Sequence, residues 1–131
     1  MVGVYEAIFS TLSGDGSLQG LLAATGTDKK VYPIARVGKS NTPSVRVAVL
    51  NGRSDVGLAI DRITVDLLVS SRVSTTELNT ISARIDTLLN RKRITTGSTV
   101  MHLLQKVYEA DGYDEQTLEY QRLMRFYIIK T

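Results

Sequence analysis

The order of apolar and polar residues predicts helix at the start of the chain. Apolar side chains recur at helical spacing at Val4, Ile8, Phe9 and Leu12. Gly14-Asp15-Gly16 then breaks the pattern, so we expect a helix of about ten residues to end there. A second short helical piece should begin with Ser17 as its cap and close at Gly26. Together the two pieces predict an N-terminal helical arm.

From residue 44 onward the pattern alternates, which predicts strands with one buried face. Val45, Val47 and Val49 point to one side of the chain, and the residues between them point to the other side. The same alternation returns from Leu58 to Ser70. Between these strands Asn51-Gly52 is a strong hairpin signal. We expect a loop there with Arg53, Ser54 and Asp55 at its tip.

A capping box and an apolar stripe predict a second, longer helix. In Ser74-Thr75-Thr76-Glu77 the Ser74 side chain can accept from the Glu77 amide while the Glu77 side chain accepts from the Ser74 amide. Apolar residues follow at helical spacing from Leu78 to Leu89. Arg91-Lys92-Arg93 is placed at the C-terminal end, where cations favour the negative pole of the helix dipole.

Two strands are predicted after a polar linker from Thr95 to Thr99: Val100 to Ala110 and Thr117 to Lys130, around a turn at Asp111-Gly112. Val31 to Arg36 contains a proline and is an edge strand or an extended passage at best. The expected fold is α+β. It has a mostly antiparallel twisted sheet of about four to five strands, built from two long hairpins and packed against one main helix, with the helical arm in front.

Length and composition limit what this chain can do. Its 131 residues suit a single domain spanning 1–131. There is no cysteine, which excludes thiol catalysis and cysteine-based metal sites, and the one histidine, His102, is expected to be structural because it shares a strand face with Leu104 and Tyr108. No nucleophile–base pair, carboxylate pair or phosphate-binding loop is evident. We expect no enzyme activity, cofactor, metal, membrane span or secretion signal.

Strand length and charge distribution point towards assembly. Strands of thirteen or fourteen residues would reach about 44 to 48 Å at ~3.4 Å per residue, whereas a globule of this length is roughly 36 Å across, so the strands must bend or project. The net charge is +3, but six basic and no acidic residues lie between Lys29 and Arg53, and five acidic and no basic residues lie between Glu109 and Glu119. Such surfaces can dock head to tail and close into a ring, which high salt would weaken.

The candidate interface residues follow from this division of charge and from the predicted turns. They are Lys29, Lys30, Arg36, Lys39, Arg46, Arg53, Asp55, Asp111, Tyr113, Asp114, Glu115 and Glu119.

Several segments carry a family resemblance. They are the helical start Leu18-Gln19-Gly20-Leu21-Leu22, the turn Val31-Tyr32-Pro33, the two mid-chain strands, the capped helix, and the closing Tyr113-Asp114-Glu115 and Tyr120-Gln121-Arg122-Leu123-Met124-Arg125-Phe126. These segments resemble the tail terminator (tail completion) proteins of long-tailed bacteriophages over nearly the whole chain.

The resemblance implies a structural virion protein at the head-proximal end of the tail, assembled in the host cytoplasm. Such a protein forms a hexameric ring, caps the tail tube, stops its polymerisation and offers a docking surface to the neck or head-completion protein. In contractile tails it also recruits the sheath terminator. DNA passes through the ring without specific binding. Such channels often have an acidic lumen, so in this net-basic chain we place the Asp111 to Glu119 tip or the Asp55 loop towards the channel or an axial partner.

Three alternatives remain open from the sequence. A head-closure or neck protein of similar size would differ in its axial partner. A small basic nucleic-acid-binding module would use Arg91 to Arg93 with Lys106, and would bind DNA in a salt-dependent way. A small enzyme would need a deep polar pocket around His102.

Overall fold

The computed structural model describes residues 3–23, 29–33, 43–54, 61–96 and 99–130. The elements in chain order are α1 (Val4–Ser13), α2 (Gly16–Leu21), β1 (Val31–Pro33), β2 (Ser44–Ser54), β3 (Asp61–Ser71), α3 (Thr75–Leu89), β4 (Lys92–Thr96), β5 (Thr99–Asp114) and β6 (Glu119–Lys130). The strands form one sheet in the order β1-β2-β3-β6-β5-β4. β1 pairs with β2 in parallel, and the other neighbours pair antiparallel.

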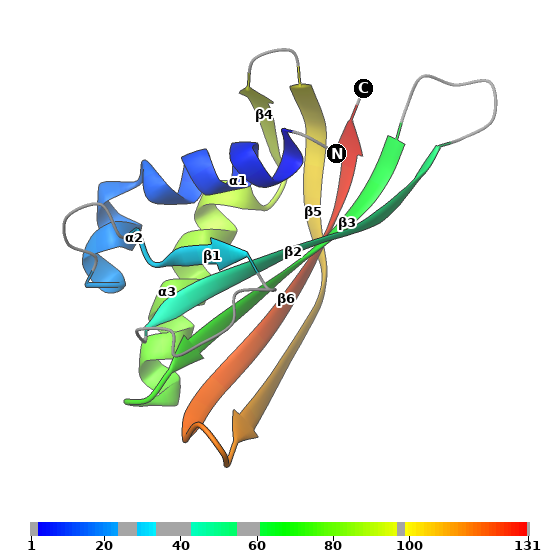
Figure 1. Cartoon of the computed structure of the whole chain (residues 1–131). Helices are drawn as coiled ribbons and strands as arrows, with labels where there is room; N and C mark the ends of the chain where they lie inside the picture. Colours follow the sequence, from blue (N-terminus) through cyan, green and yellow to red (C-terminus); the bar gives the residue numbers. More distant parts are fainter. Residues whose placement is uncertain (1–2, 24–28, 34–42, 55–60, 97–98, 131) are drawn as a thin grey trace.

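All three helices lie on one side of this twisted sheet (Figure 1). The core fills the space between them and one sheet face, where the alternation of β2 and β3 turns Val45, Val47, Ile63, Val65, Leu67 and Val69 inward. The apolar stripe of α3 and the inner residues of β6 complete this core. The predicted α+β architecture is confirmed, with six strands in the described residues rather than four or five.

Asp15, not Ser17, caps the second helix. The Asp15 carboxylate accepts a hydrogen bond from the Leu18 amide at 2.8 Å, while Ser17 lies exposed inside α2. Asp15 also receives two hydrogen bonds from Arg84 of α3, at 2.8 and 2.6 Å, so one carboxylate begins α2 and ties it to α3. The prediction of Ser17 as the cap was wrong, because Asp15 caps α2 and at the same time binds Arg84 of α3. Gly26, expected to close this helix, lies outside the described residues.

Ser71 changes the predicted capping box of α3. The Ser74 side chain accepts from the Glu77 amide at 3.2 Å, as predicted. The Glu77 carboxylate instead accepts from the Ser71 hydroxyl at 2.6 Å, and that hydroxyl oxygen accepts from the Ser74 amide at 3.4 Å. Ser71, the last residue of β3, therefore connects the Ser74 amide to the Glu77 carboxylate, which the predicted capping box would join directly.

The basic run after α3 starts a strand. α3 ends at Leu89, Arg91 has a left-handed φ of 61°, and Lys92 and Arg93 open β4. Ile94 of β4 lies opposite the buried Met101 and packs against the core. Two predictions were therefore wrong: Lys92 and Arg93 do not end the helix, and Thr95 does not begin a linker. Both fail because pairing with β5 makes Lys92–Thr96 a strand.

The strand ends differ from the predicted turns. β2 continues to Ser54 through an irregularity between Leu50 and Arg53, so Asn51-Gly52 forms a bulge, and the expected Asp55 loop tip lies outside the described residues. β5 continues to Asp114, with Gly112 opposite Gln121 inside the ladder, and the turn falls at residues 115–118. Two bulges also interrupt β5. The hairpin of β5 with β6 nevertheless extends beyond the start of α3 (Figure 1).

The first bulge of β5 also decides the environment of His102. The irregularity between Met101 and Leu103 shifts the alternation, so that Met101 and Leu104 are buried while His102 is exposed. In the described part of the chain, no helix has the length and apolar character to cross a membrane.

Candidate assembly surface

No described element covers the sheet face opposite the helices, and several apolar side chains are exposed on it. Its most exposed apolar side chains retain 36 to 53 % of their surface: Leu50, Leu103, Tyr108, Tyr127 and Ile129. They come from β2, β5 and β6, and the register places Leu103 opposite Ile129. Leu68 and Leu123, directly opposite each other and half-buried, continue the same face across the sheet. Exposed apolar side chains gathered on one face of a sheet indicate an interaction site.

One bidentate ion pair lies in the middle of that face. Arg125 of β6 donates to both carboxylate oxygens of Asp66 on β3, at 2.7 and 2.9 Å. Asp66 and Arg125 are opposite each other in the ladder, so the pair needs no bending of either strand. With its charge compensated inside the subunit, the centre of the face can be covered by a partner without leaving an unpaired ion.

Both sides of the sheet leave open backbone edges in the described residues. β4 pairs with β5 as far as Leu104, and the Asn90 side chain accepts from the Lys106 amide at 2.9 Å. Beyond this point, no described strand pairs with the outer edge of β5 from Val107 to Asp114. On the other side, β1 covers β2 only at residues 45–47 among the described strands. Open edges are ready templates for pairing with another chain.

The predicted basic residues lie in different environments. Lys29 is exposed, whereas Lys30 is buried and its ammonium donates to the Leu22 carbonyl at 3.2 Å. Arg46 lies half-buried on the uncovered sheet face, opposite Leu68. Arg53 belongs to the far end of β2, opposite Arg62. Three candidates, Arg36, Lys39 and Asp55, lie outside the described residues.

The predicted acidic residues gather on the β5–β6 hairpin, but most are compensated within the chain. Asp111 forms a bidentate pair with Arg122, whose guanidinium lowers the pKa of that carboxyl by hydrogen bonding. Glu119 is buried, 3.6 Å from Arg72. Asp114 accepts from the backbone amides of the turn, and Glu115 is exposed.

Sequence reasoning missed the residues that hold this hairpin against α3. Arg122 donates to Ser82 at 2.7 Å and to Asn79 at 2.6 Å, in addition to Asp111. Lys106 forms an ion pair with Asp86 of α3 at 2.7 Å. A turn placed at residues 115–118 would have revealed the Asp111–Arg122 pair, because the two positions are then symmetric about it. Partners forty residues away leave no such signal.

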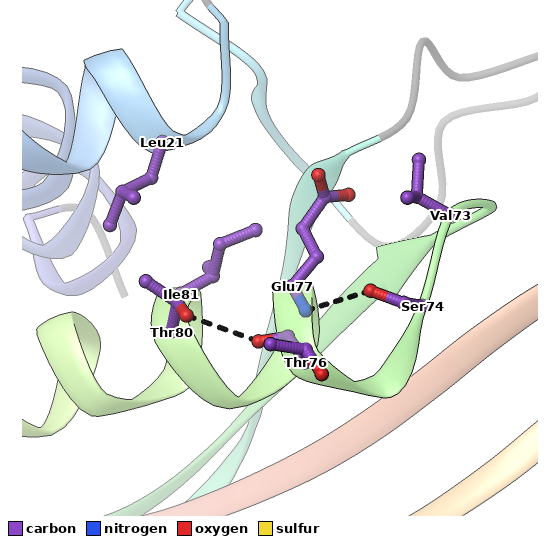
Figure 2. A pocket seen from close by; sticks show the side chains of 7 residues that line it. All are labelled: Leu21, Val73, Ser74, Thr76, Glu77, Thr80 and Ile81. Atoms are coloured by element: carbon purple, nitrogen blue, oxygen red, sulfur yellow. Dashed lines mark hydrogen bonds between the residues drawn. The ribbon is translucent and has the colours of Figure 1, made fainter.

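A cavity of about 320 Å³ opens between α2 and the start of α3 (Figure 2). Leu21, Val73 and Ile81 give it apolar walls, and its other lining residues are Ser74, Thr76, Glu77 and Thr80. Glu77 is the ionisable side chain of this lining, and its carboxylate is engaged by Ser71. The cavity thus offers apolar contact but no nucleophile–base pair.

The described residues give little support to the catalytic and nucleic-acid alternatives. Among them, no group of three or more His, Asp or Glu side chains could hold a metal ion. His102 is exposed rather than set in a pocket of the described residues. Lys106, the expected partner of Arg91 to Arg93 in DNA binding, is engaged by Asp86.

The fold is similar to that of a known virion protein. A chain from the "virion of native gene transfer agent (GTA) particle" superposes with a TM-score of 0.79 at 14 % sequence identity, covering 97 % of this chain and 93 % of that one. The two chains therefore share the same fold over nearly their whole length. No protein-family model matches the sequence, and no curated protein matches it.

A second solved structure is more distant. The SPP1 Dit protein, described as a hub of the adsorption apparatus of phages that infect Gram-positive bacteria, is 16 % identical. The match covers 67 % of this chain and 40 % of that one with a TM-score of 0.34, which is too low to indicate a common fold.

Proposed function

We propose that this protein is a structural subunit of a phage tail that self-associates into a ring, caps the tail tube and ends its polymerisation. The other face of the ring would receive the neck or head-completion protein, and DNA would pass through its channel. The observation that carries the proposal is the group of exposed apolar side chains on the sheet face that no described element covers, which an isolated subunit would leave in water. The open edges of β2 and β5 add two sites where a neighbouring copy can pair.

The shared fold supports this role. The similar chain belongs to a particle described as a virion, and our chain matches it almost from end to end. A capping ring acts by geometry: it complements the growing tube end on one face and removes that end from further addition. Ring closure requires a heterologous contact, in which two different surfaces of the subunit meet. We expect six copies, as the resemblance to tail terminators implies.

Self-association is tested with the purified protein by light scattering and electron microscopy. Ile129→Asp places a charge on the uncovered face and should leave a folded monomer, because an unpaired carboxylate cannot be buried there. Thr87→Asp on the exposed side of α3 is the matched control and should still assemble. Circular dichroism confirms that both variants fold. An unmodified protein that stays monomeric at every concentration would overturn the proposal.

The position in the virion is tested by comparing tails assembled with and without the protein. Overlong tube in its absence supports a terminator. Tails of normal length on heads that lose their DNA would instead support head closure, the alternative that differs in axial partner.

A further inference from the structure

The turn of the β5–β6 hairpin presents an exposed leucine. Leu118 keeps 62 % of its surface exposed, and its φ of 59° lies in the left-handed region. Residues with a Cβ adopt this backbone at a cost, and glycine or asparagine usually occupies it in turns. Most of this bulky apolar side chain is open to a contact outside the subunit, which would account for a leucine at a strained turn position.

The turn is already in a fixed shape. The Asp114 carboxylate accepts from the Gln116 amide at 2.9 Å and from the Thr117 amide at 3.4 Å. Behind it the rings of Tyr113 and Tyr120 are in contact, with their centroids 5.0 Å apart. A partner would therefore bind Leu118 without having to order the turn first, which reduces the entropic cost of association.

The cavity between α2 and α3 has the complementary character. Its apolar walls include Val73, which is 73 % exposed although it borders a hollow of about 320 Å³ (Figure 2). This volume is at the lower end for ligand pockets and suits an inserted side chain better than a cofactor. Its one ionisable lining residue, Glu77, is hydrogen-bonded to Ser71, so an apolar side chain would meet no unpaired acid.

Turn and cavity lie at the same end of the subunit. Arg72, the neighbour of Val73, is 3.6 Å from Glu119, the residue that follows Leu118. Figure 1 shows the hairpin turn and the start of α3 at the same end of the sheet. Copies in a ring are related by rotation without translation, so two surfaces that meet must lie at one height along the ring axis. The turn and the cavity would meet this condition in a ring whose axis runs along the hairpin.

Charged residues lie beside the turn and close to the cavity. Glu115 is exposed in the turn that carries Leu118. Arg72 precedes the cavity residue Val73 in the sequence, its side chain is 48 % exposed, and its contact with Glu119 is long at 3.6 Å, which leaves it able to meet a second carboxylate. Such complementarity orients an incoming turn and disfavours the reverse contact.

We infer that Leu118 of one copy inserts into the α2–α3 cavity of the neighbouring copy, with Glu115 near the neighbour's Arg72, as one of the heterologous contacts that close the ring. The inference rests on the proposed self-association, and it adds a second contact to the one made by the sheet.

The absence of cysteine from the chain allows a direct test by disulfide trapping. Leu118→Cys and Val73→Cys subunits, one of them tagged, are mixed under mild oxidation, and we expect a covalent heterodimer. Leu118→Cys mixed with Ser10→Cys, an exposed position on α1, is the control and should give none. In the double variant, a ring gives a covalent ladder that ends at the ring number. Dimers alone, or no heterodimer from an assembled mixture, would overturn the inference.

A second variant separates this contact from self-association in general. Leu118→Asn removes the apolar side chain but suits the left-handed backbone, so the subunit should fold at least as stably. We expect association to weaken about tenfold or more, as for an anchor residue in an interface. If Leu118→Asn assembles normally while Ile129→Asp is monomeric, the inference fails and the proposed ring survives. If the unmodified protein never assembles, both fail.

Discussion

Asp111 on β5 and Arg122 on β6 face each other across the last hairpin, with two guanidinium nitrogens 2.6 and 2.9 Å from the two carboxylate oxygens. The same guanidinium reaches Ser82 and Asn79 on α3. One arginine therefore closes the hairpin and fixes its direction relative to the helical layer. This matters for assembly because the turn at residues 115–118 lies beyond the Asp111–Arg122 pair, so the direction of the turn depends on the contacts of Arg122 with α3.

Removal of Arg122 should loosen the hairpin from α3. Arg122→Ala deletes four hydrogen bonds of a side chain that is 13 % exposed, and we expect it to lower the free energy of unfolding by about 1 to 3 kcal/mol. Arg93→Ala, at an exposed position on β4, should change it by no more than about 0.5 kcal/mol. Urea denaturation measures both. Equal effects would show that Arg122 is an ordinary surface residue.

Stability should fall in acid because hydrogen bonds hold carboxyls such as Asp111 and Asp15 ionised. Hydrogen bonding from Arg122 lowers the pKa of Asp111, and hydrogen bonding from Arg84 lowers the pKa of Asp15. A pKa that is lower in the folded state stabilises the protein above the unfolded value, about 3.9, and this contribution is lost as the pH falls through the folded pKa. The melting temperature should therefore drop below about pH 4. Asp111→Asn should flatten that drop.

Two neighbouring substitutions distinguish the observed cap of α2 from the one that the sequence suggests. Asp15→Ala removes the bond to the Leu18 amide together with the two bonds from Arg84, and should cost about 1 kcal/mol, the usual value for an N-cap, or more. Ser17→Ala, inside the helix, should stay within about 0.5 kcal/mol. Thermal unfolding of both variants under one condition decides the matter, and the reverse order of effects would restore Ser17 as the cap.

Gly112 gives a comparable test of the hairpin. In the structure it lies within β5 opposite Gln121, and an added Cβ would meet no atom within 4 Å. Gly112→Ala should therefore raise the free energy of unfolding by about 0.4 to 1 kcal/mol, because the unfolded chain loses freedom. A turn at Asp111-Gly112 would give the opposite sign, since such turns require a positive φ. Chemical denaturation of the variant measures the sign directly.

The predictable and unpredictable parts of the fold differ in the range of the interactions that produce them. Helical spacing located α1 and α3, and alternation located β3, because each pattern lies within one element. β4 depends on pairing with β5, and the bulges at Asn51-Gly52 and His102 depend on the register of a partner strand. Local turn signals were therefore misplaced where a long strand continued through them.

The same limit applies to the candidate surface. The acidic hairpin was visible in the sequence as a run of charges, but its compensation by Arg122 and Arg72 was not. The apolar outer face was also missed, because Leu123, Tyr127 and Ile129 alternate with buried residues that are equally apolar. Because β6 has apolar residues on both faces, its sequence is typical of a strand buried on both sides. The position of the helices shows which face the described elements leave uncovered.

The response of assembly to salt separates the contributions of charge and apolar area. The division of charge along the sequence predicts an assembly that salt weakens, but Asp111 and Glu119 already have partners in their own chain, and Lys30 is buried. Glu115 with Arg72 and the apolar sheet face then carry the contact. Exposed charges are largely screened at 1 M salt, whereas apolar burial is retained. We therefore expect the midpoint concentration of assembly to rise by about threefold or less between 0.15 and 1 M NaCl, measured by light scattering. Glu115→Gln should remove most of this rise, and complete dissociation in 1 M NaCl would show that charge, not the sheet face, dominates the contact.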